Sequence, residues 1–231
     1  MEHTLKVTNV LSDPTRFKIY QYLVQHHKAV TVNEISEQFD IHPNVARMHL
    51  TKLQDINLLI SYSEKTGRGG RPSRLYCLSE KVIELNFPYR DYKLFANMAL
   101  ETLAELGDIG TKALYVTGKK YGSKVMERYH TQATMELTNE QKVQILEDAG
   151  VMLGLYPNIS YDSKKGKISF TINNCPFKEI ATNNQQLVCN THLYFLKGMF
   201  ESLFTNVKFI ENENMFKGCE SCTYIAKLSA V

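Results

Sequence analysis

The sequence predicts an α+β fold that is divided into three parts. Apolar residues recur at helical spacing through residues 14–53 and again through residues 91–150, and segments typical of strands follow each of these stretches. Four of the five cysteines stand in the last quarter of the chain. We therefore predict an N-terminal domain over residues 1–88, a helical linker or dimerisation region over 89–150, and an α+β cysteine-rich domain over 151–231.

Length and composition indicate a globular protein. The chain has 231 residues, 43% of them apolar, which is enough for two modest domains with buried cores. No apolar run approaches the roughly 18 residues of a membrane-spanning helix. The first residues lack the apolar segment of a secretory signal, so we expect a cytoplasmic protein in which thiols stay reduced.

The positive charge is concentrated at the front of the chain. Residues 1–90 hold 12 of the 27 Lys and Arg residues but only 9 of the 24 Asp and Glu residues, so they carry the whole net charge of +3. An excess of this size is weak evidence for nucleic-acid binding when taken alone.

Local signals predict three helices in the first domain. Asp13 followed by Pro14 is typical of a helix start, because the carboxylate caps free amides and proline suits the first turn. Thr31 and Glu34 form a capping box that starts a short second helix. Pro43 begins the third helix after a tight turn. Two short helices around a turn are typical of a helix–turn–helix, although an ordinary three-helix bundle shows the same pattern.

The third helix is the predicted recognition helix. Val45, Leu50 and Leu53 are expected to face the core. Polar residues early in such a helix reach base edges and phosphates, so we take as candidate DNA contacts Pro43, Asn44, Arg47, Thr51 and Lys52.

A predicted hairpin follows the helices. Leu58–Tyr62 and Arg74–Leu78 have the pattern of strands, and the loop between them contains three glycines flanked by arginines. A basic hairpin tip beside a helix–turn–helix can contact phosphates or the minor groove. The candidate contacts are Arg68, Arg71 and Arg74, and the alternative is a solvated hairpin whose charge is incidental. Together these features predict a winged helix–turn–helix that binds DNA.

The middle region is predicted to form three helices, over 91–106, 111–129 and 139–150. Inward positions in the first are Leu94, Phe95, Met98, Leu103 and Leu106. Glycines at 118 and 122 inside the second allow either close packing or a bend. We expect one of the three helices to form a dimer contact, and the sequence does not show which.

The C-terminal domain is predicted to place its cysteines in loops and at the ends of elements. The expected strands are 155–161, 167–173, 207–211 and 222–228, with helices over 177–181 and 189–204.

The spacing of the cysteines predicts a metal or cluster site. Cys219 and Cys222 are spaced so that both sulfurs can meet one ion across a tight turn. Cys189 and His192 share a face if the segment is helical, and Cys175 directly precedes a proline. Thiolates are soft ligands that select zinc, copper(I) or iron–sulfur clusters. The alternative is a set of scattered core thiols, which is our interpretation of Cys77 in the predicted hairpin.

Several motifs resemble a known family. The segments 12–16 (Ser-Asp-Pro-Thr-Arg), 46–50 (Ala-Arg-Met-His-Leu) and 67–76 (Gly-Arg-Gly-Gly-Arg-Pro-Ser-Arg-Leu-Tyr) resemble bacterial ArsR-type winged-helix repressors. Within that group, the motifs around Cys175, Cys189 and Cys222 are similar to the branch of SufR-type iron–sulfur repressors. The resemblance implies a homodimer on a palindromic operator of double-stranded DNA.

The same resemblance implies an iron–sulfur cluster held by Cys175, Cys189 and Cys222. Cys219 departs from the family pattern, in which a non-ligand and often acidic residue is expected. The fourth ligand is therefore Cys219 or His192, and zinc in the same cysteines is the alternative metal. A thiol redox enzyme fused to a helix–turn–helix is a less favoured interpretation, because the sequence shows no nucleotide-binding loop and no catalytic triad.

Overall fold

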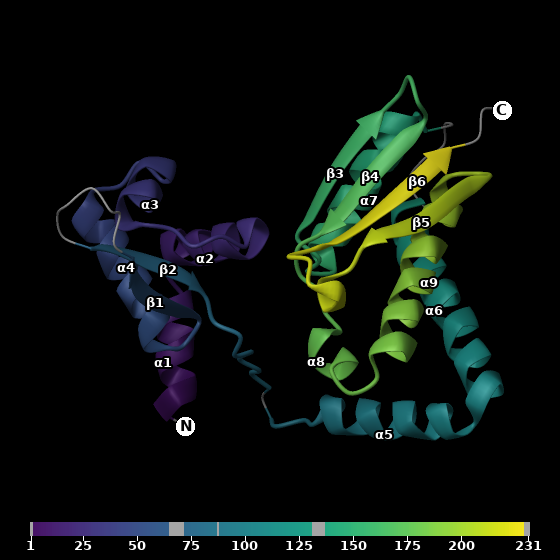
Figure 1. Ribbon diagram of the computed structural model, residues 1–231, viewed down its shortest axis with the longest axis horizontal. Coiled ribbons are helices and arrows are strands. Elements are labelled where there is room, and N and C mark those ends of the chain that lie inside the picture. The colour runs from purple at the N-terminus through teal and green to yellow at the C-terminus, as the bar shows by residue number, and fades with distance from the viewer. Residues whose placement is uncertain (1, 65–71, 87, 131–136, 229–231) are drawn as a thin grey trace. The chain divides into compact units, whose positions relative to one another are not determined.

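The protein forms two compact units, Met1–Arg90 and Asp91–Val231, in the computed structural model (Figure 1). The structure describes residues 2–64, 72–86, 88–130 and 137–228. None of the helices in these ranges is long and apolar enough to cross a membrane.

The first unit consists of helices followed by a hairpin. Its elements are α1 (Glu2–Leu11), α2 (Pro14–His26), α3 (Val32–Gln38), α4 (Pro43–Asp55), β1 (Leu59–Glu64) and β2 (Ser73–Leu78). The predicted caps are confirmed: an Asp13 side-chain oxygen accepts a 2.8 Å hydrogen bond from the Arg16 amide, and Thr31 and Glu34 form a reciprocal capping box. Strands β1 and β2 pair in antiparallel fashion from Leu59 opposite Leu78 to Glu64 opposite Ser73.

The core of the first unit differs from the prediction at two points. Helix α1 was not predicted, and it buries Val7 and Val10 against the other helices. Val45 was predicted to face the core, but it is 38% exposed. The buried positions of α4 are Ala46, His49, Leu50 and Leu53, which follow the spacing of a single helix face. The prediction relied on large apolar residues, and it therefore did not recognise the small Ala46 and the polar His49 as part of the buried face.

The second unit packs helices on an antiparallel sheet. The helices are α5 (Tyr92–Glu105), α6 (Gly107–His130), α7 (Asn139–Met152), α8 (Lys178–Ala181) and α9 (Gln185–Leu203), with a short 3-10 turn, η1 (Met215–Lys217). The strands are β3 (Pro157–Asp162), β4 (Lys167–Ile172), β5 (Val207–Glu213) and β6 (Cys222–Leu228), in the order β3-β4-β6-β5. Figure 1 shows α7 and α9 behind the sheet, with α6 beside α9.

One face of the sheet supplies six of the fifteen described buried residues in the core cluster of this unit. Alternate residues of β4 and β6 are buried, as the two-residue period of a strand requires. They pack against α9, where the Phe200 ring meets the Phe170 ring edge-on at a centroid distance of 5.6 Å. Met126 of α6 and Leu146 of α7 complete the same cluster. The predicted strand and helix pattern of this domain is therefore confirmed as a helix layer on a sheet.

The middle helices differ from the prediction in what they bury. Leu94, Phe95, Met98 and Leu106 were predicted to face inward, but they are 57%, 72%, 58% and 58% exposed. None of the described residues of α5 is fully buried. An apolar helix face is the same in sequence whether it covers a core or stays uncovered, so periodicity alone did not distinguish the two.

The C-terminal end of α7 and the N-terminal end of α6 also differ from their predicted positions. Gly150 was predicted to close a helix, but α7 continues past it to Met152. Gly150 therefore lies within the helix, where it packs against Pro157 at the start of β3. Helix α6 begins at Gly107, four residues before the predicted start at residue 111.

Helices α6 and α9 approach each other through glycines. A Cβ atom on Gly122 would lie 1.9 Å from the Phe195 carbonyl oxygen, and one on Gly198 would lie 2.1 Å from that of Lys119. Such distances are possible only when no side chain is present. The Ser123 hydroxyl donates a 3.2 Å hydrogen bond to the Gly198 carbonyl across the contact. The glycines inside α6 therefore permit close packing.

We predict that Gly122→Ala destabilises the second unit. In an open helix this change stabilises by about 1 kcal/mol, because alanine is the better helix former. Here the added methyl group collides with backbone, and overpacking of this kind costs about 1–3 kcal/mol or more. Chemical unfolding should therefore show a lower free energy of unfolding. Lys120→Ala, at an exposed position of the same helix, serves as the control, and equal stability of both variants would contradict the close contact.

Candidate nucleic-acid interface and cysteine site

Helix α4, the predicted recognition helix, presents most of its predicted contacts to solvent. Asn44, Arg47 and Lys52 are exposed on α4, and Thr51 is half-buried. Pro43 is exposed at the first turn, which His42 caps by accepting a 3.2 Å hydrogen bond from the Asn44 amide. The predicted outer face of α4 is thus available to a partner.

The loop end of the hairpin shares a hollow with this helix. Arg47 of α4 and Arg74 of β2 line one cavity of about 410 Å³, together with the start of α3 around Thr31. The Arg74 guanidinium donates 3.0 Å hydrogen bonds to Gln54 of α4 and to Ser61 of β1. These bonds orient one arginine beside the other. The predicted contacts Arg68 and Arg71 lie outside the described residues.

A buried polar group connects α1, α2 and α4. Arg16 is only 4% exposed, donates a 2.6 Å hydrogen bond to the Val10 carbonyl and pairs with Asp13 at 3.6 Å. Bonding to the Arg16 backbone amide lowers the pKa of Asp13. His49 of α4 is buried nearby, and desolvation lowers its pKa. Sequence analysis missed this group, because an arginine and a histidine at helical positions have the pattern of surface residues.

Three cysteines converge at one end of the sheet in the second unit. Cys175 follows β4, Cys222 begins β6 opposite Ile172 of β4, and Cys189 lies in the second turn of α9. Burial raises the pKa of Cys175 to about 12, and the nearby Cys222 and Cys189 thiols raise it further. Burial is also the main cause of the raised pKa of Cys189 and of Cys222, each with the other close by. All three thiols are therefore protonated at neutral pH when no metal is bound.

His192 lies against the same group. Its Nδ1 is 3.7 Å from the Cys175 sulfur, and its ring meets Phe177 edge-on at a centroid distance of 5.1 Å. The side chain is 3% exposed, and burial lowers its pKa to about 4. Its Nε2 has no hydrogen-bond partner among the described residues. The histidine is thus neutral at pH 7, and its Nε2 forms no hydrogen bond with the described residues.

The end of β5 and the loop before β6 bring the side-chain oxygens of Glu211 and Asn214 to the same end of the sheet. Asn214 is 4% exposed and donates a 3.0 Å hydrogen bond to Glu211, while the Met215 amide donates to the Cys222 sulfur at 3.4 Å. Cys219 follows Gly218, whose φ of 87° makes the turn, and it is half-buried. Sequence analysis missed Glu211 and Asn214, because carboxylate and amide residues carry no signal without a known neighbour.

The donor set fits a soft metal in its chemistry but does not form a closed site. Thiolates and imidazole suit zinc and iron–sulfur clusters. Within the described ranges, no three His, Cys, Asp or Glu side chains stand close enough to hold one ion. A metal would therefore need the thiols and the Cys219 loop to draw together. Cys77 lies on β2 in the first unit, where burial raises its pKa.

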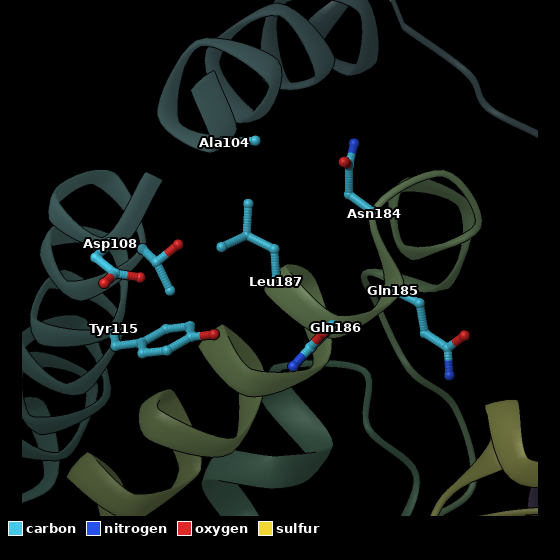
Figure 2. A pocket seen from close by; sticks show the side chains of 8 residues that line it. Ala104, Asp108, Tyr115, Asn184, Gln185, Gln186 and Leu187 are labelled. Atoms are coloured by element: carbon cyan, nitrogen blue, oxygen red, sulfur yellow. The ribbon is translucent and has the colours of Figure 1, made fainter. Parts of the chain in front are cut away.

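Two cavities lie beside the N-terminal half of α9. Figure 2 shows the larger, of about 490 Å³, where Tyr115 and Asp108 of α6 face Asn184, Gln186 and Leu187. The Tyr115 hydroxyl accepts a 3.1 Å hydrogen bond from Asn190. Six of the eight described residues that line this cavity are polar. The second cavity, of about 290 Å³, lies between α5, α6, α8 and α9 and is lined almost wholly by apolar side chains.

A comparison of families identifies the front of the chain. A family model described as a helix-turn-helix domain matches residues 11–61, which cover α2 to α4 and the start of β1. No curated protein matches the chain. The family match confirms the predicted helix–turn–helix and supports a DNA-binding transcriptional regulator rather than an enzyme.

Two solved structures are similar to larger parts of the chain. One is a trafficking protein particle complex subunit 3 from Naegleria fowleri, covalently bound to palmitic acid; it is 14% identical, and the match covers 60% of this chain and 91% of that chain at a TM-score of 0.41. The other is the phenol-responsive sensory domain of the transcription activator PoxR with phenol. It is 14% identical, and the match covers 79% of this chain and 89% of that chain at a TM-score of 0.44. At these TM-scores, neither similarity assigns a ligand to this chain.

We predict that Arg47→Ala reduces discrimination between specific and nonspecific DNA. A bidentate arginine contact to a base edge is worth about 1–3 kcal/mol of discrimination. Binding of the full-length protein to a selected operator and to unrelated DNA should therefore differ less in the variant. Lys18→Ala, on the exposed side of α2, removes the same charge as a control. If Arg47→Ala lowers both affinities equally, the side chain contacts only the phosphate backbone.

Proposed function

We propose that the protein is a homodimeric transcriptional repressor that binds a palindromic operator through its winged helix. The helix-turn-helix match supports the DNA-binding part, and the shared hollow of Arg47 and Arg74 supports contact by helix and hairpin together. Dimeric regulators of this class read two half-sites about one helical turn apart, so a palindrome follows from the two-fold symmetry.

We further propose that an iron–sulfur cluster controls operator affinity. The convergence of three thiols carries this proposal: Cys175 and Cys222 are buried, and Cys189 is half-buried beside them. These residues would hold the cluster, with Cys219 or His192 as the fourth ligand. A bound cluster would supply a group whose oxidation or loss changes the charge and spacing of its ligands. Because the free thiols are protonated, binding releases protons and strengthens as the pH rises.

Zinc is the second candidate for the same residues. The contact between Cys175 and His192 favours it, because mixed cysteine and histidine sets are usual for structural zinc. A zinc site would stabilise the second unit without a redox response, and the signal would then enter elsewhere.

Control of DNA affinity requires two states of the dimer. A cluster shifts the equilibrium only if it binds one state more tightly than the other. The cysteines occupy the ends of β4 and β6 and the second turn of α9, so drawing them together would move α9 against the sheet. That movement reaches α6 directly through the glycine contact between the two helices.

The exposed face of α5 is the proposed dimer surface. Leu94, Phe95 and Met98 lie together on this face and are more than half exposed. Contiguous exposed apolar side chains are unusual on a monomer and mark interaction surfaces. A second copy of the chain would bury these apolar side chains and would supply the second recognition helix that a palindromic operator needs.

We predict that Phe95→Lys weakens the dimer. A lysine at the centre of the α5 surface would have to lose its hydration on association, which opposes binding. Sedimentation of the full-length protein should show dissociation at a higher concentration than for the wild type, with a parallel loss of operator affinity. Lys93→Glu alters charge at an exposed position of the same helix as a control. A dimer that tolerates Phe95→Lys would place the interface on another surface.

We predict that serine at Cys175, Cys189 or Cys222 abolishes metal binding. Each replacement removes a thiolate ligand while leaving the winged helix folded. Anaerobically purified wild-type protein should show the visible absorption of an iron–sulfur cluster together with iron and sulfide, whereas zinc alone would favour the second candidate. Cys77→Ser, in the first unit, should leave the metal in place.

His192→Ala separates the two possible fourth ligands. Loss of metal would make His192 a ligand, and retained metal would make Cys219 the fourth. Protein that carries neither iron nor zinc and titrates four free thiols in the second unit would contradict the metal proposal.

A further inference from the structure

We propose that the apolar cavity between α5, α6, α8 and α9 binds a small neutral apolar molecule, and that Phe177 transmits its presence to the Cys175–His192 pair. This effector site goes beyond the proposed function, because it requires no metal. The argument rests on the chemistry of the walls, the size of the cavity and its contact with the cysteine site.

The walls exclude charged ligands. Ala96, Leu100 and Leu103 of α5 face Leu114 of α6 and Ile180 of α8 across the cavity. The one hydroxyl in the lining belongs to Thr191, and it already donates a 2.7 Å hydrogen bond to the Leu187 carbonyl. An ionised ligand would lose its hydration here and gain no partner in return. A neutral apolar molecule gains from the same walls by removing their surface from water.

The size of the cavity sets the size of the ligand. A cavity of about 150 Å³ lined by Leu, Ile and Phe side chains is large enough to bind benzene. The volume here is about 290 Å³, so it suits a molecule of two or three fused rings, roughly ten to fifteen non-hydrogen atoms by that measure. The cavity is partly open to solvent, so its apolar walls lie in contact with water until a ligand covers them.

The cavity and the proposed dimer surface occupy different faces of α5. Helical geometry places Ala96, Leu100 and Leu103 on one side, and Phe95 and Met98 on another. The cavity is walled by four helices of one chain, whereas Phe95 and Met98 are exposed. A second copy on the exposed face therefore leaves the cavity free for a small molecule.

Phe177 connects the cavity to the cysteine site. Its side chain lines the cavity, and its ring lies edge-on to His192, whose Nδ1 is 3.7 Å from the Cys175 sulfur. Val188 and Thr191 of α9 line the cavity within one turn of His192. A ligand that packs on Phe177 favours one position of that ring, and thereby changes the surroundings of the histidine and the thiol.

The first test uses a neutral fluorescent probe, 1-aminoanthracene, with full-length protein freed of iron and zinc. We expect saturable binding of one probe per chain, with fluorescence enhanced by the apolar surroundings. Ala99→Phe, which fills the cavity from α5, should weaken binding at least tenfold. Met98→Phe, at the residue directly before Ala99 and on the exposed face of α5, should leave probe binding unchanged. The anionic naphthalene-1-sulfonate should not compete.

Equal binding by wild type, Ala99→Phe and Met98→Phe would overturn the site. Weaker binding by Met98→Phe alone would do the same, because the probe would then lie on the exposed face. Loss of probe binding upon dimerisation of wild-type protein would show that a second copy fills the cavity, which also contradicts the proposal.

The second test measures transmission to the thiol. Alkylation of Cys175 by iodoacetamide, followed residue by residue by mass spectrometry, should change several-fold in rate when the probe saturates the cavity. Phe177→Leu should keep probe binding and lose most of this change, while alkylation of Cys77 should not respond in either protein. An unchanged Cys175 rate at saturation would overturn the transmission. Because the protein carries no metal, neither result depends on the iron–sulfur or zinc proposal.

Discussion

The close contact between α6 and α9 is the constraint on which the second unit depends. Gly122 and Gly198 let the two backbones meet where any side chain would collide with a carbonyl oxygen. The stacked rings of Tyr115 and Tyr194, 4.9 Å apart, and the ion pair between Lys119 and Glu201 extend the contact along both helices. With α9 fixed in this way, its opposite side is held against β4 and β6 and forms the core.

The same helix positions both proposed sites. Cys189 and His192 project from α9 toward the ends of β4 and β6, where Cys175 and Cys222 stand, and Val188 and Thr191 line the apolar cavity. A rigid helix that carries residues of two sites can couple them, since a shift of the helix is felt at both. In the first unit, the buried Arg16 connects α1 to α2 beside His49 of α4.

Much of the fold could be predicted because its signals are local. Capping residues such as Asp13 and Thr31 satisfy free amides within three residues, so their effect does not depend on the rest of the chain. The buried face of α4 was predicted incompletely, because Ala46 is small and His49 is polar and the prediction relied on large apolar side chains. The faces of α5 were assigned wrongly, because burial depends on what packs against a helix.

The sequence by itself determined the helix–turn–helix, the hairpin, the α+β order of the last domain and the clustering of its cysteines, because these follow from short-range spacing and chain order. Tertiary structure alone decided which cysteines approach one another, that His192 and Asn214 are buried beside them, and that α5 lines a cavity with one face and exposes the other. These features depend on contacts between residues far apart in the chain, and no local pattern encodes such distances.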